Sequence, residues 1–309
     1  MSSIEVRPFH RNDREQLAAL VKAHAAAVVP GLTVSVNAVL SQLEREAGEF
    51  IVDPWVSERT TLVAEQRQRI VAAAHLLRFA SDERVSESYR DAGEMRWFLF
   101  WPEAPYWPDS AEAADALIAA CIDQLGRWGV ARQYADGTLP APGVYGVPDQ
   151  WPHIRMIYER SGFVHDGHTE IVYIANVDRL RGAPEPPVAG LSVRRSVGIN
   201  GTRLSALLDG DEVAGYIEVE TLQDAGRMPQ HAAWADIGNL YIADKHRRHG
   251  IATWLIAQAG EWLQLARVEL VLGYTWPEQK DCNALLERVG FRELTRTERG
   301  WVRTPLQPR

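Results

Sequence analysis

The chain has 309 residues, of which 46% are hydrophobic and 24% charged, and its net charge is −8. This composition is typical of a soluble globular protein with room for two domains, and the acidity argues against a nucleic-acid partner. Because no apolar run approaches the ~20 residues that span a bilayer, the N-terminus lacks a signal core and only two cysteines are present, we expect a cytoplasmic protein with no metal and no membrane partner.

Apolar patterning in the first part of the chain predicts an alternation of strands and helices. In chain order these are strand 4–8, helices 14–27 and 37–46, strands 61–65, 70–79 and 94–101, and helix 111–128. Further on, Ile157–Phe163 (IYERSGF) has the pattern of a last helical turn followed by a glycine just past the helix end.

A linker is predicted over residues 178–190, because this segment has no apolar periodicity and its three prolines favour an extended spacer. It separates residues 1–177 from residues 191–309. In the second part the predicted elements are strands 191–195, 202–208, 213–220 and 233–242, helix 251–265, strand 269–274 and a helix that ends at 289. Asp209-Gly210, between two of these strands, predicts a hairpin turn.

The two parts share a helix-stop signature, since Ile157–Phe163 recurs as Leu285–Phe291 (LLERVGF). Alone, this signature marks only the end of a helix, but the similar order of elements before each copy predicts a duplicated domain. The copies differ at one point. Two helices are predicted between the first and second strands of the first domain, where the second domain has only residues 196–201. The second domain is therefore predicted to be truncated near its N-terminus.

A basic turn, Lys245 to His249, interrupts this acidic chain directly after the apolar strand end Leu240-Tyr241-Ile242. Gly250 and an apolar-periodic helix follow at once, so several backbone N–H groups and a helix N-terminus point to one place. This arrangement suits a phosphorylated ligand. Without the strand and the glycine, a solvated charged turn would be the simpler interpretation.

The loop at residues 247–252 (RRHGIA) has the pattern Arg or Gln, two residues, Gly, one residue, then Gly or Ala. With the strand before it and the Leu286–Phe291 segment after it, this resembles the GNAT acyltransferase superfamily, clearly over residues 202–294 and more loosely over 4–175. The whole chain is similar to tandem GNAT proteins, an organisation shared with mycothiol synthases. The resemblance implies an α/β (α+β) fold of two GNAT-like domains, each a mixed, mostly antiparallel sheet flanked by helices.

The resemblance also implies acetyl-CoA as co-substrate, with its pyrophosphate on the backbone amides of residues 248–253 and its pantetheine arm along the strand that ends at Ile242. Lys245 and the neighbouring arginines can pair with the 3′-phosphate. Gln279 takes the register of a family asparagine. The predicted coenzyme-binding residues are Leu240, Tyr241, Ile242, Arg247, Arg248, His249, Gly250, Ile251, Ala252, Thr253 and Gln279.

Some members of the family have a carboxylate base six residues before the last residue of this strand, which here is Asp236. Strand alternation places Asp236 on the face of Leu240 and Ile242. Glu218 and Glu220, on the preceding strand, are alternative bases that would act through water. The competing interpretation of Asp236 is a strand-edge carboxylate in solvent.

The usual proton donor for the leaving thiolate in the family, a tyrosine, has no counterpart in the second domain, because Leu286 stands at that position. The first domain keeps it as Tyr158. Tyr241 and Tyr274 are the phenols that can replace it, and Cys282 is interpreted as a packing residue.

The first domain is predicted to be degenerate, because its loop 102–110 has no glycine and no Arg or Lys, and its three prolines remove amide donors. We therefore predict that this domain does not bind coenzyme A productively. Four of its tryptophans are candidates for lining an acceptor cleft, although core or interface positions are the commoner role. They are Trp97, Trp101, Trp107 and Trp151.

These features predict an acetyl-CoA-dependent N-acetyltransferase that acts on a primary amine of a small molecule, by direct attack assisted by a base, with its active site in residues 191–309. The alternative is a coenzyme A-binding sensor without turnover, which Leu286 favours, whereas the retained loop and Asp236 favour the enzyme. The acidic chain favours a cationic acceptor through steering alone. We expect a monomer or homodimer. Only three of the 33 basic residues are lysines, which is typical of bacteria with GC-rich genomes.

Overall fold

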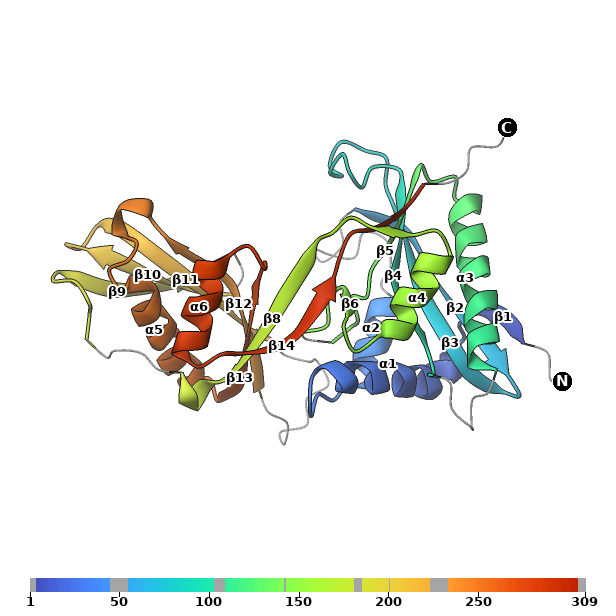
Figure 1. The fold of residues 1–309 in the computed structure, drawn as a ribbon, viewed down its shortest axis with the longest axis horizontal. Helices are drawn as coiled ribbons and strands as arrows, with labels where there is room; N and C mark the ends of the chain where they lie inside the picture. The colour runs from blue at the N-terminus through green and yellow to red at the C-terminus, as the bar shows by residue number, and fades with distance from the viewer. Residues whose placement is uncertain are drawn as a thin grey trace. The chain divides into compact units, whose positions relative to one another are not determined.

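The computed structural model of the chain describes residues 4–44, 55–102, 109–141, 143–180, 185–199, 201–222 and 233–304. It divides into two compact units, Met1–Thr169 with Thr297–Arg309, and Glu170–Arg296. Each unit is a mixed sheet flanked by helices, as predicted (Figure 1). No described helix is long and apolar enough to cross a membrane.

The first unit is built on a sheet of order β1-β2-β3-β4-β5-β15-β7. The strands of this sheet are β1 (Glu5–Pro8), β2 (Val56–Gln66), β3 (Arg69–Phe79), β4 (Ala92–Phe100), β5 (Arg132–Ala135), β7 (Val164–His165) and β15 (Trp301–Arg303). The short strand β6 (Val147–Pro148) lies in the first unit but pairs in the other sheet. The helices of the first unit are α1 (Arg14–Val28), α2 (Val36–Glu44), α3 (Ser110–Arg127) and α4 (Pro152–Arg160). The sequence does not predict β5, β6 and β7, because strands of two to four residues carry no clear alternation.

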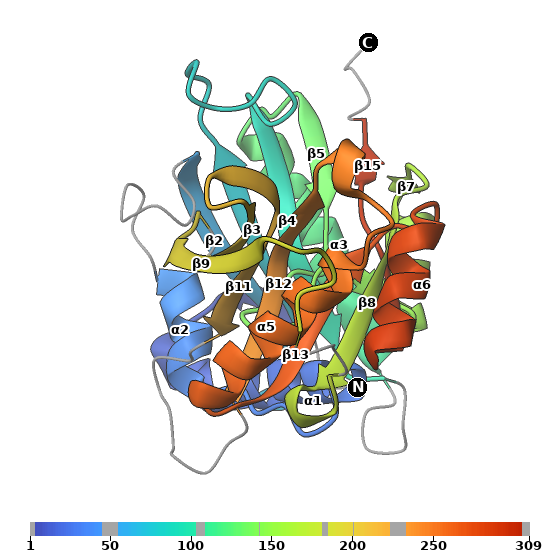
Figure 2. The ribbon, with the colours of Figure 1, turned by 90° about the vertical axis from the view of Figure 1, so that its left-hand side faces the viewer.

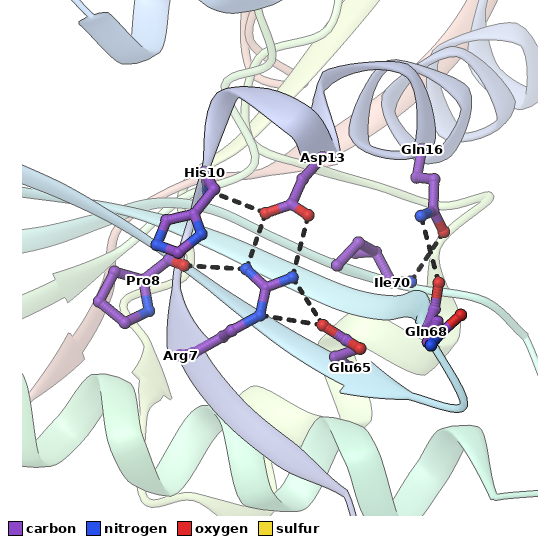
Figure 3. A network of polar contacts seen from close by, with 8 residues as sticks. All are labelled: Arg7, Pro8, His10, Asp13, Gln16, Glu65, Gln68 and Ile70. Atoms are coloured by element: carbon purple, nitrogen blue, oxygen red, sulfur yellow. Dashed lines mark hydrogen bonds and ion pairs between the residues drawn. The ribbon is translucent and has the colours of Figure 1, made fainter.

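An arginine on β1 fixes the start of α1 (Figure 3). Arg7 Nη1 and Nη2 donate to the two carboxylate oxygens of Asp13 at 2.8 and 2.9 Å, and Arg7 Nε donates to Glu65 on β2 at 2.9 Å. Asp13 also accepts the backbone N–H of His10 at 2.8 Å. The guanidinium holds the pKa of Asp13 below its usual value. This network joins β1, β2 and the turn before α1, so its role is structural.

The second sheet has the order β6-β14-β8-β13-β12-β11-β10-β9, with β6 paired to the end of β14. The strands of the second unit are β8 (Thr169–Asn176), β9 (Leu191–Val197), β10 (Thr202–Leu208), β11 (Glu212–Leu222), β12 (Ala233–Ile242), β13 (Val268–Thr275) and β14 (Arg292–Glu298), and its helices are α5 (Ile251–Leu265) and α6 (Lys280–Val289). The bounds of β10, β12 and α5 are those predicted from the sequence. Asp209 and Gly210 have φ of 49° and 92°, which confirms the predicted hairpin. Only residues 198–201 separate β9 from β10, so the predicted truncation is confirmed.

Helix α5 packs against β10 to β13 and covers one face of this sheet (Figure 2). The predicted linker, as far as it is described, also packs against the second unit. Leu180 and Val188 lie against the same hydrophobic core, and the Leu180 side chain lies beside Gly260 of α5. Residues 181–184 are outside the described part of the chain.

The two parts of the chain exchange their last strands. In the second unit β8 lies between β13 and β14, and its antiparallel register with β13 runs from Asn176 opposite Leu270 to Ile171 opposite Thr275. In the first unit β15 lies between β5 and β7, with Trp301 at both pairings. The compact units therefore do not follow the division into 1–177, 178–190 and 191–309, which stays a prediction about two homologous parts. The exchanged strands β8 and β15 take equivalent positions in the strand orders of the two sheets, which favours duplication.

Trp301 gives a direct test of this exchange. It is 1% exposed, and its ring lies 5.9 Å from Tyr158 and 5.1 Å from His165, all within the first unit. Trp301→Ala should therefore lower the free energy of unfolding of the first unit by about 3–5 kcal/mol in urea titrations. Trp276→Ala, at a side chain that is 39% exposed, is the control. Equal losses in both variants would contradict the exchange.

Candidate active site

The sheet of the second unit opens between β12 and β13. The two strands pair in parallel only as far as Asp236 opposite Leu272. Beyond that point β12 continues to Ile242 and β13 to Thr275 without a register between them. The backbone groups on this edge of β12 are therefore available to an extended ligand that adds like a strand. Asp236 lies at the point where the strands separate.

A bulge in β12 decides which side chains share a face with Asp236. Opposite β11, Asn239 pairs with Glu218 but Ile237 pairs with Val219, so Gly238 is an extra residue. The prediction that Asp236 shares a face with Leu240 and Ile242 is therefore wrong, because the extra residue reverses the alternation. Leu240 and Ile242 pack against the core. Gly238 is the only signal of the bulge in the sequence.

On the face opposite the core, β11 and β12 carry a row of polar side chains, which we call the polar row. Its members are Tyr216, Glu218, Glu220, Asp236, Asn239 and Tyr241. Asn239 Nδ2 donates to the Tyr216 hydroxyl at 3.2 Å, and the rings of Tyr216 and Tyr241 are 5.5 Å apart. Sequence reasoning missed Tyr216 and Asn239. Period-two alternation from Glu218 reaches Tyr216, but the bulge hides Asn239.

Glu218 is engaged by its neighbours. Its carboxylate is 1% exposed, and Oε1 accepts hydrogen bonds from Arg203 Nε at 2.6 Å and from the backbone N–H of Ile199 at 3.2 Å. Arg203 stands directly opposite Glu218 on β10, and Ile199 lies in the short β9–β10 turn. This ion pair fastens the turn that replaces the two helices of the first unit. One oxygen of Glu218 is thus held by Arg203 and by the turn, and its predicted role as a base remains a prediction.

Asp236 and Glu220 face each other directly across β12 and β11. Asp236 is half-buried, and its Oδ1 is buried without a hydrogen-bond partner. Among the described residues, neither carboxylate has an ion pair. Burial, and then the charge of Glu220, raise the pKa of Asp236 to about 6. A carboxylate with this pKa is mostly ionised at neutral pH and is a stronger base than an ordinary aspartate.

The basic turn and the start of α5 form an anion-binding geometry at the end of β12. Arg248 and Gly250 both have positive φ, 66° and 81°, and the first backbone bond of the helix runs from the N–H of Trp254 to the carbonyl of Gly250. The N–H groups of residues 251–253 therefore have no acceptor inside the helix. The first turn of α5 contains no acidic residue. Such a helix start suits a diphosphate.

The side chains of the basic turn are partly matched by acids. Lys245 and His246 both contact Glu212, at 2.5 and 2.8 Å. Arg247 contacts Asp244 at 2.9 Å.

The other arginine of the turn, Arg248, contacts Asp281 of α6 at 2.9 Å, and both side chains are more than 80% exposed. Ion pairs as exposed as this one are weak, so Arg248 can exchange Asp281 for a ligand phosphate. Gln279 is the residue that precedes α6, and its Oε1 accepts the backbone N–H of Trp276 at 3.2 Å.

In the second unit a leucine stands at the position of the family tyrosine. In the first unit the tyrosine is present but buried. Leu286 is 3% exposed and lies against Gly273 and Phe291. Tyr158 is fully buried and donates to the carbonyl of Asp136 at 2.8 Å, and burial raises its pKa well above the usual value.

Two phenols belong to the strands that border the opening of the second sheet. Tyr274 lies two residues beyond Leu272 on β13, on the face of Asp236, and Tyr241 belongs to the polar row. Cys282 is half-buried against the core, and burial raises its pKa, as expected of a packing residue.

The first unit has a bulge at the equivalent place in β4, but the side chains on the corresponding face of its sheet are buried. On β4 the register shift lies opposite His75 and Leu76, which makes Arg96 the extra residue. Alignment of the two bulges gives the equivalents of the polar row, each at most 4% exposed: Ala73, His75, Leu77, Glu94, Trp97 and Leu99. In the first unit this face of the sheet is therefore buried in the core. Trp97 belongs to it, and Trp151 is 1% exposed. Trp107 lies outside the described residues.

The corresponding strands of the first unit, β4 and β5, remain hydrogen-bonded beyond the equivalent point. β4 and β5 pair as far as Met95 opposite Ala135, and the backbone N–H of Thr138 then donates to the carbonyl of Arg96 at 3.0 Å. Helix α3 begins after Asp109 and has Glu112 in its first turn, which disfavours an anion there. Residues 103–108 lie outside the described part. The absence of coenzyme binding in this unit stays a prediction, which these flanking features favour.

Residues 191–291 match the model of the acetyltransferase (GNAT) family. The chain carries a GNAT acetyltransferase domain. The opening between β12 and β13, the basic turn and Asp236 all lie inside the GNAT domain. The fold of this family implies acyl transfer from an acyl-coenzyme A.

Solved structures share the fold of the whole chain. A tandem GNAT protein from the clavulanic acid biosynthesis pathway is 16% identical, with a TM-score of 0.65 over 97% of each chain. A GCN5-related N-acetyltransferase from Sphaerobacter thermophilus is 14% identical, with a TM-score of 0.61 over 97% of this chain and 94% of that one. The GCN5-related glucosamine N-acetyltransferase region of a fungal multi-domain GH3 β-N-acetylglucosaminidase gives 0.64 at 14% identity, and the match covers 98% of this chain but 38% of that chain. None of the curated proteins matches the chain in sequence.

Proposed function

We propose that the chain is an acetyl-CoA-dependent N-acetyltransferase that acetylates a primary amine of a small molecule at the opening between β12 and β13. The observation that carries this proposal is the place of Asp236. A half-buried carboxylate with an unpartnered oxygen stands where an open strand edge begins, and an anion-binding helix start lies at the other end of that edge.

The residues present fit acetyl-CoA, which supplies the activated acetyl group. The open edge of β12 from Ile237 to Ile242 offers backbone groups to the pantetheine arm. The N–H groups of residues 251–253 have no acceptor within α5 and can bind the diphosphate, and the basic residues Lys245, Arg247 and Arg248 precede them in the chain. The buried Leu286 leaves the core side of the opening apolar.

Asp236 acts as the general base in this proposal. A primary amine is protonated at neutral pH, so a proton must leave its nitrogen before attack, and the raised pKa of Asp236 suits this step. The departing thiolate needs a proton in turn. Since Leu286 cannot donate, that proton comes from a phenol on the face of Asp236, Tyr274 or Tyr241.

The test combines binding and turnover. Isothermal titration should show acetyl-CoA binding, and thiol release should then depend on an added primary amine from a panel of mono-, di- and polyamines. Binding without thiol release for any amine would contradict the proposal and would instead indicate a coenzyme sensor.

A further inference from the structure

Two carboxylates face each other in the polar row. Glu220 and Asp236 are direct cross-strand partners, and like charges in that relation destabilise a sheet. Among the described residues, no cation contacts either of them, although Glu218 on the same row has Arg203 at 2.6 Å. The negative charge is therefore concentrated at one place, beside the point where the strands separate.

The first unit carries different residues at the equivalent pair of positions. Glu94 is the equivalent of Asp236, and it has its own cation, Arg96 at 3.3 Å. The equivalent of Glu220 is Leu77, which is 2% exposed. In the second unit the apolar partner is replaced by an exposed carboxylate, and no cation within the described ranges contacts either side chain. A ligand can supply that missing charge.

The neighbouring rings also suit a cation. Tyr216 and Tyr241 continue the polar row beyond Asp236, and Tyr241 is 45% exposed. One face of Tyr216 already holds a guanidinium, since Arg203 Cζ lies 4.3 Å from the ring centroid. These rings lie four and five residues along the strands from Glu220 and Asp236, so they extend the face that an acceptor meets while the two carboxylates make the contacts with its cations.

We propose that the acceptor carries two cationic nitrogens, one that is acetylated at Asp236 and a second that Glu220 holds. This inference rests on the proposed function and adds a substrate class to it. Directly opposite side chains have Cβ atoms about 4.5–5.5 Å apart, so the two nitrogens are separated by a short chain of about three to five carbons. Short aliphatic diamines and the polyamines built from them meet this requirement.

The experiment compares acceptors that differ only at the far end: putrescine, 4-aminobutanol and n-butylamine. With the wild-type chain, kcat/KM for putrescine should exceed that for the other two by about 10-fold or more. Glu220→Gln should bring the ratio close to one. Glu261→Gln, at an exposed glutamate of α5, should keep the wild-type ratio. Raised salt should lower the ratio, because Glu220 is exposed.

The outcomes separate this inference from the proposed function. Equal use of the three amines by the wild-type chain would overturn the inference and leave N-acetyl transfer standing. An equal fall for all three in Glu220→Gln would make Glu220 a base and would also overturn it. If no amine is acetylated, isothermal titration of putrescine into the chain decides. Binding that is weakened by Glu220→Gln supports a dication site, and absence of binding refutes it.

Discussion

Replacing Asp236 with asparagine is expected to lower kcat/KM for acetyl transfer by about 10²- to 10⁴-fold and to leave acetyl-CoA binding in place. Asparagine keeps the shape of the side chain but cannot accept the proton of the amine. The wild-type rate should fall as the pH drops below about 6, because Asp236 is then protonated. Steady-state rates between pH 5 and 9 measure this limb, and its persistence in Asp236→Asn would exclude Asp236 as its source.

The same substitution should stabilise the fold. The pKa of Asp236 is about 6 in the folded state, above the value of about 3.9 of an unfolded aspartate. The folded state therefore binds a proton more tightly, and stability decreases as the pH rises from about 4 to 6. Asp236→Asn should gain about 1–3 kcal/mol at pH 7.5 and nothing at pH 4. Urea unfolding measures the gain, with the exposed Asp211→Asn as control. A loss of stability at pH 7.5 would contradict the burial of an unpartnered charge.

Replacing Gly250 with glutamate should weaken acetyl-CoA binding by at least about 100-fold. Three effects act together. The backbone at Gly250 has φ of +81°, which disfavours any other residue. A Cβ there would lie 3.2 Å from the Cβ of Pro187, and a carboxylate would oppose the diphosphate at the start of α5.

Gly210 supplies a matched control for this substitution. It has φ of +92° in the β10–β11 hairpin, and nothing lies within 4 Å of the position of its missing Cβ. Gly210→Glu therefore imposes similar backbone strain without approaching the proposed coenzyme site. Isothermal titration should show normal affinity in Gly210→Glu and a loss in Gly250→Glu. Tight binding that survives in Gly250→Glu would place the coenzyme elsewhere, including in the first unit.

Local patterns account for much of the fold. The bounds of β10, β12 and α5 follow from alternation, from the Asp209-Gly210 turn and from the glycine that precedes α5. The exchange of β8 and β15 does not follow from the sequence. A strand pattern indicates which face is apolar, but it does not indicate which of two similar sheets provides the neighbouring strands.

The candidate site is likewise predictable from the sequence only in part. The basic turn is visible in the sequence because residue type and spacing are enough to indicate anion binding. The polar row is not, because Gly238 reverses the alternation of β12 and joins Asp236 to Asn239 and Tyr241. The engagement of Glu218 by Arg203 is also invisible, since it depends on the register between β10 and β11.

Amine-dependent thiol release by four proteins tests the central claim most directly: wild type, Gly210→Glu, Gly250→Glu and Asp236→Asn. If acyl transfer takes place at the opening between β12 and β13, wild type and Gly210→Glu release thiol when an amine is added. Gly250→Glu then loses release through weak binding, and Asp236→Asn loses it with acetyl-CoA still bound. Release at the wild-type rate in both of these last variants would contradict an active site in the second unit.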